Sequence, residues 1–288
     1  MKRARLGRLL GTSVLGLAGR LPLAAAASGW DELNMPRGVT SASRSIYALH
    51  MMALWVCVGI AVVVFGVMIW SLIFHRKSRG AVPDVTLTHS TKVEVVWTAV
   101  PVLILIGMAI PAARLLLKIN NNTDPQVNIR VTGFQWGWRY QYVGTPVSII
   151  SKLSASSNEA SQMHSGIRPT AVPHYLLSVD HQVVVPVGEK VRLLITSIDV
   201  IHSWWVPDLG VKRDAIPGYI NEASFTIAAN RPGIYRGQCT ELCGRGHAYM
   251  PIVVRAVTPA AYEAWLKRHS GPPSEAAMPP AAAAVTRS

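Results

Sequence analysis

Two long apolar runs, followed by a series of short alternating runs, dominate the hydrophobic pattern of the chain. Residues 49–74 and 95–117 are almost continuously apolar, and each run is long enough to cross the hydrocarbon core of a membrane as a helix. Pro101 and Pro111 lie within the second run, where membrane helices tolerate proline because neighbouring groups satisfy the freed backbone. The pattern therefore predicts two N-terminal transmembrane helices.

The loop between the two runs, residues 75–94, carries a cluster of basic side chains. They are Arg76, Lys77, Arg79 and Lys92. Positively charged loops stay on the cytoplasmic side, so this loop is predicted to be cytoplasmic. Residues 28–48 and everything from residue 118 onward are then predicted to be periplasmic.

From residue 118 the chain is predicted to form one all-β domain that ends at residue 257. Its β-branched and aromatic runs predict strands over 126–132, 135–143, 175–179, 183–187, 190–196, 203–206, 222–226, 233–238 and 251–257. Short strands without long helices between them are typical of an antiparallel sandwich or barrel. Residues 144–173 are predicted to form a long loop with a short helix. Thr258 and Pro259 predict a final helix over 258–269, and residues 270–288 are predicted to be disordered.

The first 27 residues have the pattern of a secretory signal peptide. A basic start precedes an apolar region, 9–23, and an A-x-A cleavage signal at residues 25–27. An uncleaved anchor is the alternative, although Arg20 and Pro22 interrupt the apolar region. Cleavage removes five basic residues and no acidic one, so the formal charge falls from +13 to +8. Because membrane topology accounts for much of the remaining charge, no nucleic-acid partner is expected.

Four soft metal ligands lie within twelve residues, and they are Cys239, Cys243, His247 and Met250. Thiolate and thioether ligands select copper, whereas carboxylates select harder ions. His202, which stands among apolar and aromatic residues, is the best candidate for a further ligand. A single copper ion of the electron-transfer type needs two histidines, one cysteine and a weak methionine. One thiolate is therefore surplus.

The surplus thiolate indicates a centre with two copper ions. If both cysteines bridge the ions, each ion takes one histidine and one weak ligand, Met250 on one ion and a backbone carbonyl such as that of Glu241 on the other. A disulfide between Cys239 and Cys243 is the alternative in an oxidising compartment, but it does not explain the nearby histidines and methionine. The third cysteine, Cys57, lies in an apolar run and is interpreted as a packing residue.

This loop resembles the CuA loop of subunit II of haem-copper cytochrome c oxidases of the bacterial type, with its arrangement of Cys, Glu, Cys, His and Met. Residues 202–218 and the aromatic segment 133–140 resemble two further segments of that family. The resemblance implies a cupredoxin-like Greek-key barrel. It also implies that Trp136 lies on the route by which electrons enter, whereas packing within a sheet is the alternative role of this residue.

The resemblance gives two glutamates possible roles beyond copper binding. The side chain of Glu241 is implied to bind a magnesium or manganese ion shared with subunit I, in keeping with the preference of hard ions for carboxylates. A solvated loop carboxylate is the alternative. Glu94 matches an acidic residue near the cytoplasmic entrance of a proton channel in the partner subunit, whereas an ordinary carboxylate at a helix start is the simpler interpretation.

The implied function is that of subunit II of a proton-pumping oxidase in a bacterial inner membrane. Cytochrome c would supply electrons to two copper ions, which relay them to haem in subunit I, where oxygen is reduced to water. The expected partners are subunit I, other oxidase subunits, cytochrome c and membrane lipid. No haem is expected in this chain, because it has no Cys-x-x-Cys-His motif. The alternatives are a copper subunit of another respiratory reductase, a copper-delivery protein, and a quinol oxidase subunit II, which lacks the copper ligands.

Four acidic residues near the copper segments form a locally acidic surface, and they are Asp199, Asp208, Asp214 and Glu222. Such a surface would steer a basic cytochrome c, since complementary charge raises association rates. Residues 120–270 nevertheless carry 14 Lys and Arg against 10 Asp and Glu. A less basic donor, or apolar contact around Trp136, is consistent with this balance.

Overall fold

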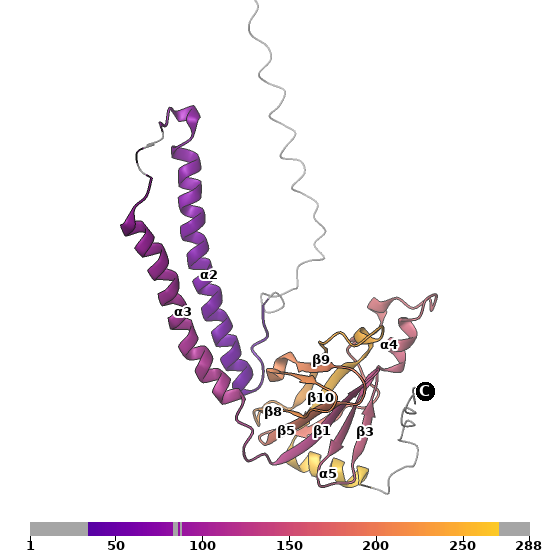
Figure 1. Cartoon of the computed structure of the whole chain (residues 1–288). Helices are drawn as coiled ribbons and strands as arrows, with labels where there is room; N and C mark the ends of the chain where they lie inside the picture. The colour runs from indigo at the N-terminus through magenta and orange to yellow at the C-terminus, as the bar shows by residue number, and fades with distance from the viewer. Residues whose placement is uncertain (1–33, 83–85, 87, 271–288) are drawn as a thin grey trace, which may run out of the picture. The chain divides into compact units, whose positions relative to one another are not determined.

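A computed structural model describes residues 34–82, 86 and 88–270. The predicted signal peptide, and residues 271–288 of the predicted disordered tail, lie outside the described residues. The described residues begin with two long helices, α2 (Ser41–Phe74) and α3 (Thr91–Ile119), which lie side by side (Figure 1). A short 3₁₀ helix, η2 (Lys77–Arg79), stands between them in the sequence.

Helix α2 begins at Ser41, before the apolar run that starts at residue 49. A capping box fixes this start: the backbone N–H of Ser43 donates to Thr40 Oγ1 over 2.9 Å, and the backbone N–H of Thr40 donates to Ser43 Oγ over 3.0 Å. The polar first turns therefore belong to the helix, although the hydrophobic pattern does not include them.

Both helices are long and apolar enough to cross a membrane. Ser43 is the only residue of α2 that is buried, and α3 has none, so both helices present apolar side chains such as Trp55 and Leu103 at the surface. An exposed apolar surface of this extent is typical of contact with lipid or with partner helices. The predicted pair of transmembrane helices agrees with this architecture.

Within the described residues, ten strands form two five-stranded sheets. The first sheet has the order β3-β2-β1-β5-β8, with β1 (Val127–Phe134), β2 (Gly137–Tyr142), β3 (Ser148–Ser151), β5 (Lys190–Ser197) and β8 (Asn221–Thr226). The second has the order β4-β10-β9-β6-β7, with β4 (Val183–Pro186), β6 (His202–Val206), β7 (Val211–Ala215), β9 (Gly233–Cys239) and β10 (Pro251–Val257). The predicted β domain is therefore a sandwich.

The strand prediction differs from the structure in three respects. The sheets are mixed, because β1 pairs parallel with β5 and β4 pairs parallel with β10. The predicted strand 175–179 is wrong: Leu176 has a positive φ of 58°, which an extended strand does not allow, and only Val179 forms a bridge, to Leu153. Strands β3 and β7 are absent from the prediction. Strand β3 lies in the predicted loop 144–173, and β7 carries three charged residues, which disfavour a strand.

That presumed loop also contains a short helix, α4 (Ala155–Ala160), as predicted, and a 3₁₀ helix, η3 (Pro169–Ala171). A further 3₁₀ helix, η4 (Pro207–Leu209), connects β6 to β7.

The core of the sandwich is filled by the alternating inner residues of both sheets. In β5, Val191, Leu193 and Ile195 are at most 2% exposed, and the residues between them are more exposed. Trp138 and Trp204 are completely buried. The final helix, α5 (Pro259–His269), begins after the N-cap Thr258 and packs its aromatic residues against Tyr142.

Candidate metal centre

The pairing of β6 with β9 brings together candidate ligands that are far apart in the sequence. His202 is the first residue of β6, and Cys239 is the last residue of β9. The two strands are antiparallel, with Trp204 opposite Cys239, so His202 lies beside the end of β9. The remaining candidates lie between β9 and β10: Cys243 in the loop, His247 at the start of the 3₁₀ helix η5 (His247–Tyr249), and Met250 just before β10.

The sulfur of Cys243 lies at the centre of this group. It is 3.9 Å from the sulfur of Cys239, 3.5 Å from His247 Nδ1 and 3.4 Å from Met250 Sδ. The sulfur of Cys239 is in turn 3.3 Å from the carbonyl oxygen of Glu241. The loop therefore brings the side chains of His247 and Met250 and one backbone carbonyl into contact with the two cysteine sulfurs.

Both cysteines are free thiols. Their sulfurs are 3.9 Å apart, whereas a disulfide bond measures about 2.05 Å. Two metal–thiolate bonds of about 2.3 Å at a tetrahedral angle would hold the sulfurs roughly 3.8 Å apart, so the observed spacing suits a shared metal ion. The ligand atoms of His202, Cys239 and Cys243 all lie within 4.8 Å of one another.

The chemistry of this group fits copper. His202, Cys239, Cys243 and Met250 have exposed fractions of 0%, 3%, 2% and 1%. Thiolate, thioether and imidazole are soft or intermediate ligands, which copper prefers. His202 Nδ1 is buried and has no hydrogen-bond partner among the described residues, so this nitrogen is available to a metal ion.

Asp199 determines which nitrogen of His202 is available. Its Oδ1 lies 2.9 Å from His202 Nε2, so the imidazole donates from Nε2 and leaves the lone pair on Nδ1. The carboxylate also accepts from the backbone N–H groups of Gln135 and Val200, over 2.6 and 2.7 Å. Partial burial opposes ionisation, but these hydrogen bonds outweigh it and lower the pKa of Asp199.

The two thiols have different affinities for protons. Burial would raise the pKa of Cys239, but contacts with His202 and with the backbone of Ser203 outweigh it, and the pKa lies below its ordinary value. Burial and the neighbouring Cys239 thiolate both raise the pKa of Cys243. Two thiolates at this distance repel each other, so a cation is needed for both to be ionised.

Trp136 is half-buried and in contact with the ligand loop. Its Nε1–H donates to the carbonyl oxygen of Cys243 over 3.1 Å, and Gln135 Nε2 donates to the same oxygen over 2.8 Å. The loop approaches the indole closely because it has glycine there: a Cβ at Gly246 would lie 2.3 Å from Trp136 Cδ2. The guanidinium of Arg245 lies 5.7 Å from the centroid of the indole, within the range of a cation–π contact.

The two glutamates lie in different surroundings. Glu241 is exposed at the ligand loop, where its backbone oxygen contacts Cys239. Glu94 lies in the first turn of α3, where the helix dipole favours a carboxylate. It is not part of the metal-ligand group, which contains His202, Cys239 and Cys243.

Three supporting residues were not recognised from the sequence in the roles that the structure gives them. Gln135 stands next to Trp136, and Arg245 stands two residues from both Cys243 and His247, yet neither is singled out by the sequence pattern, which predicts Asp199 only as a surface acid. The spacing of Asp199 and His202, three residues apart at a strand start, was the available signal.

The fold and the site together define a membrane-anchored β-sandwich protein with a buried group of thiol, thioether and imidazole side chains whose chemistry suits copper. The chain belongs to the cytochrome c oxidase subunit II family. Residues 127–257 match the family described as "Cytochrome C oxidase subunit II, periplasmic domain", and residues 28–115 match the corresponding transmembrane domain. Membership makes the chain a subunit of an oxidoreductase complex, beside subunit I, with its C-terminal domain in the periplasm.

Two relatives compared by sequence support this assignment. Cytochrome c oxidase subunit 2 of Cyanidium caldarium is 41% identical over 199 residues, which cover 68% of this chain and 73% of the relative. The subunit 2 of Oenothera berteroana is 35% identical and covers 88% of this chain and 96% of its own length. The crystal structure of the periplasmic domain of subunit II (CoxB) of Bradyrhizobium japonicum is 37% identical, with a TM-score of 0.42, and covers 51% of this chain and 94% of its own.

Proposed function

We propose that the chain holds a CuA centre of two copper ions and passes electrons from a cytochrome c to haem in subunit I. The observation that carries this proposal is the second thiol. One copper ion would need only one of the two buried cysteines, yet both lie among the other ligands, with their sulfurs 3.9 Å apart.

The ligand set is large enough for two ions. The ligand atom of His202 lies within 4.8 Å of both cysteine sulfurs, and the sulfur of Cys239 also contacts the Glu241 carbonyl. His247 and Met250 both contact the sulfur of Cys243. Bound copper supplies one-electron redox chemistry. The chain supplies a dry and rigid frame, because buried ligands on paired strands move little when the charge changes.

Trp136 is proposed as the point of electron entry. Its indole is half-buried, so an arriving donor can approach one side while the Nε1–H···O hydrogen bond joins the other side to the backbone of Cys243. The donor would be a c-type cytochrome, because the oxidase family takes electrons from that class. The carboxylate of Asp199 is largely occupied by its hydrogen bonds, so the acidic docking surface depends more on Asp208, Asp214 and Glu222.

Two further roles are part of the same proposal. Glu241 binds magnesium or manganese through its exposed side chain, at the junction with subunit I, and Glu94 marks the cytoplasmic entrance of a proton channel in that subunit. The membrane is a bacterial inner membrane, which the signal-peptide pattern and the basic loop between the helices support. A quinol oxidase subunit is disfavoured, because that class lacks the copper ligands and this chain carries all of them.

Metal analysis with electron paramagnetic resonance tests the copper centre. The detergent-solubilised chain, loaded with copper, is expected to hold two coppers and to give the signal of one electron shared by two ions. Cys239→Ser and Cys243→Ser should each abolish that shared-electron signal, whereas Cys57→Ser, which changes the third thiol, should leave it intact. An unchanged two-copper spectrum in both site variants would refute the assignment.

A further inference from the structure

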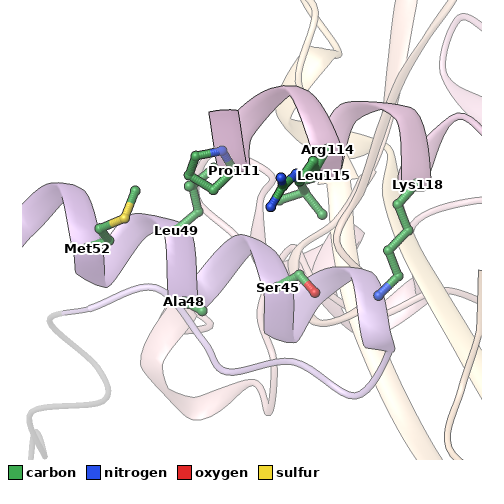
Figure 2. Close-up of a pocket in the computed structure, with 8 residues that line it drawn as sticks. All are labelled: Ser45, Ala48, Leu49, Met52, Pro111, Arg114, Leu115 and Lys118. Atoms are coloured by element: carbon green, nitrogen blue, oxygen red, sulfur yellow. The ribbon is translucent and has the colours of Figure 1, made fainter. Parts of the chain in front are cut away.

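A pocket of about 410 Å³ lies between α2 and α3, away from the copper ligands. Helix α2 contributes Ser45, Leu49 and Met52, and helix α3 contributes Pro111, Arg114 and Lys118. The pocket is divided by polarity: Figure 2 shows Lys118 and Ser45 toward one end and Met52 toward the other, with Arg114 between them.

The basic side chains of this pocket have no carboxylate nearby. Arg114 and Lys118 are four residues apart, so they share one face of α3, and no acidic residue lines the pocket. Within the described part of the chain, no ion pair involves either side chain. Arg114 also falls inside the apolar run 95–117, where an ionised group needs a partner.

Membrane topology does not account for these charges. The positive-inside rule explains basic residues at the cytoplasmic ends of helices, but Arg114 and Lys118 lie at the periplasmic end of α3, close to its last residue, Ile119. A positive pair at that end is suited to an anion at the level of the membrane interface.

We propose that this pocket binds an anionic phospholipid of the outer leaflet. The phosphate lies between the guanidinium of Arg114 and the ammonium of Lys118, and one acyl chain runs along Leu49, Met52 and Pro111. The Ser45 hydroxyl donates to the backbone oxygen of Ser41 over 2.9 Å, so it offers acceptor lone pairs that suit a hydroxyl-bearing headgroup such as glycerol. This proposal depends on the membrane-spanning helices and not on the copper chemistry.

A carboxylate of a neighbouring subunit is the competing occupant. It would neutralise the basic end but leave the apolar end, lined by Leu49 and Met52, empty. A phospholipid matches both ends of the pocket at once, because its charged headgroup and its apolar chain are joined in the same order along the membrane normal. The polarity of the pocket therefore favours lipid.

Native mass spectrometry of the oxidase complex that contains this chain tests the proposal. The complex is placed in nanodiscs of equal phosphatidylglycerol and phosphatidylcholine, and the lipid retained after gentle ejection is measured. Arg114→Gln with Lys118→Gln should lower phosphatidylglycerol retention roughly 25-fold, since each cation contributes about a factor of five. The matched control, Arg76→Gln with Lys92→Gln, removes two charges at the cytoplasmic side and should leave retention unchanged.

A second variant separates shape from charge. Ala48→Phe fills the pocket, which Ala48 also lines, and keeps both cations, and it should likewise reduce retention. An unaltered copper spectrum in each variant shows that the chain has folded. The proposal would be overturned if phosphatidylcholine were retained as well as phosphatidylglycerol, or if the double variant kept all of its lipid. Displacement of the lipid by inorganic phosphate, or release of subunit I in place of lipid, would also overturn it.

Discussion

The two halves of the chain use apolar residues in opposite ways. Helices α2 and α3 keep theirs on the outside, as Leu103 shows with an exposed fraction of 66%, whereas the β-sandwich buries residues such as Val131 and Ile195 completely. Burial of apolar area is the main favourable contribution to folding. The sandwich therefore contains its own source of stability, and the helix pair relies on lipid and partner subunits.

This difference explains where the copper site lies. A metal centre needs ligands that are fixed before the ion arrives, and rigid, buried elements fix them best. His202 and Cys239 are held on paired strands of the sandwich, whereas α3 has no buried residue that would fix a ligand on it. Substitutions in the sandwich and in the helices should therefore differ in their effects on stability and on the copper site.

The largest expected effect comes from Trp204→Ala in the sandwich. Trp204 is 0% exposed, and its Nε1–H donates to the hydroxyl of Tyr140 over 3.2 Å. The variant leaves a large cavity and an unpaired hydroxyl, so the free energy of unfolding should fall by about 3–5 kcal/mol. Thermal denaturation of the β domain followed by circular dichroism measures it. Trp97→Ala, at a residue that is 61% exposed on α3, should leave that transition unchanged.

The next contrast is between a glycine of the ligand loop, Gly246, and a glycine of α3, Gly107. Gly246→Ala places a Cβ 2.3 Å from the indole of Trp136, which must shift, at a cost of about 1–3 kcal/mol. Because the same loop carries His247, both the copper spectrum and the rate of reduction by a cytochrome c should change. Gly107→Ala in α3 meets nothing within 4 Å and should alter neither. If stopped-flow reduction were equally fast in the two variants, the contact with Trp136 would not matter for electron entry.

Asp199→Asn tests how the sandwich positions its histidine ligand. The amide offers a weaker acceptor to His202 Nε2 and loses the charge that favours the tautomer with a free Nδ1. Substitution of such a supporting residue typically lowers metal affinity 10- to 100-fold. A copper competition titration measures this loss. Asp214→Asn removes an equal charge from the neighbouring β7 and should leave copper affinity unchanged. Equal losses in both variants would indicate a general electrostatic effect.

Local chemistry made much of this molecule predictable. Type and spacing alone singled out the four soft side chains from Cys239 to Met250, which the structure brings together. Length alone singled out the two apolar runs as membrane helices. The final helix was predicted from its N-cap, Thr258, and the first-turn proline, Pro259.

Features that depend on distant partners were not predictable in the same way. The parallel pairing of β1 with β5 joins segments about sixty residues apart, and nothing local to Val127 specifies Val191 as its partner. The positive φ of Leu176 overrides an apolar run that otherwise favours a strand. The role of Asp199 emerges only when the fold brings Gln135 and His202 to the same carboxylate.

The smallest expected effect lies at Thr40, where the helix pair meets the sandwich. Thr40 caps α2 by accepting from Ser43, and its hydroxyl donates to the Leu209 carbonyl over 2.9 Å. Thr40→Ala removes both bonds and should cost about 0.5–2 kcal/mol. Thr40→Ser keeps the hydroxyl and should retain most of that stability, as chemical denaturation in detergent would show. If both variants lost the same amount, the methyl group, and not the hydroxyl, would be what joins the two regions.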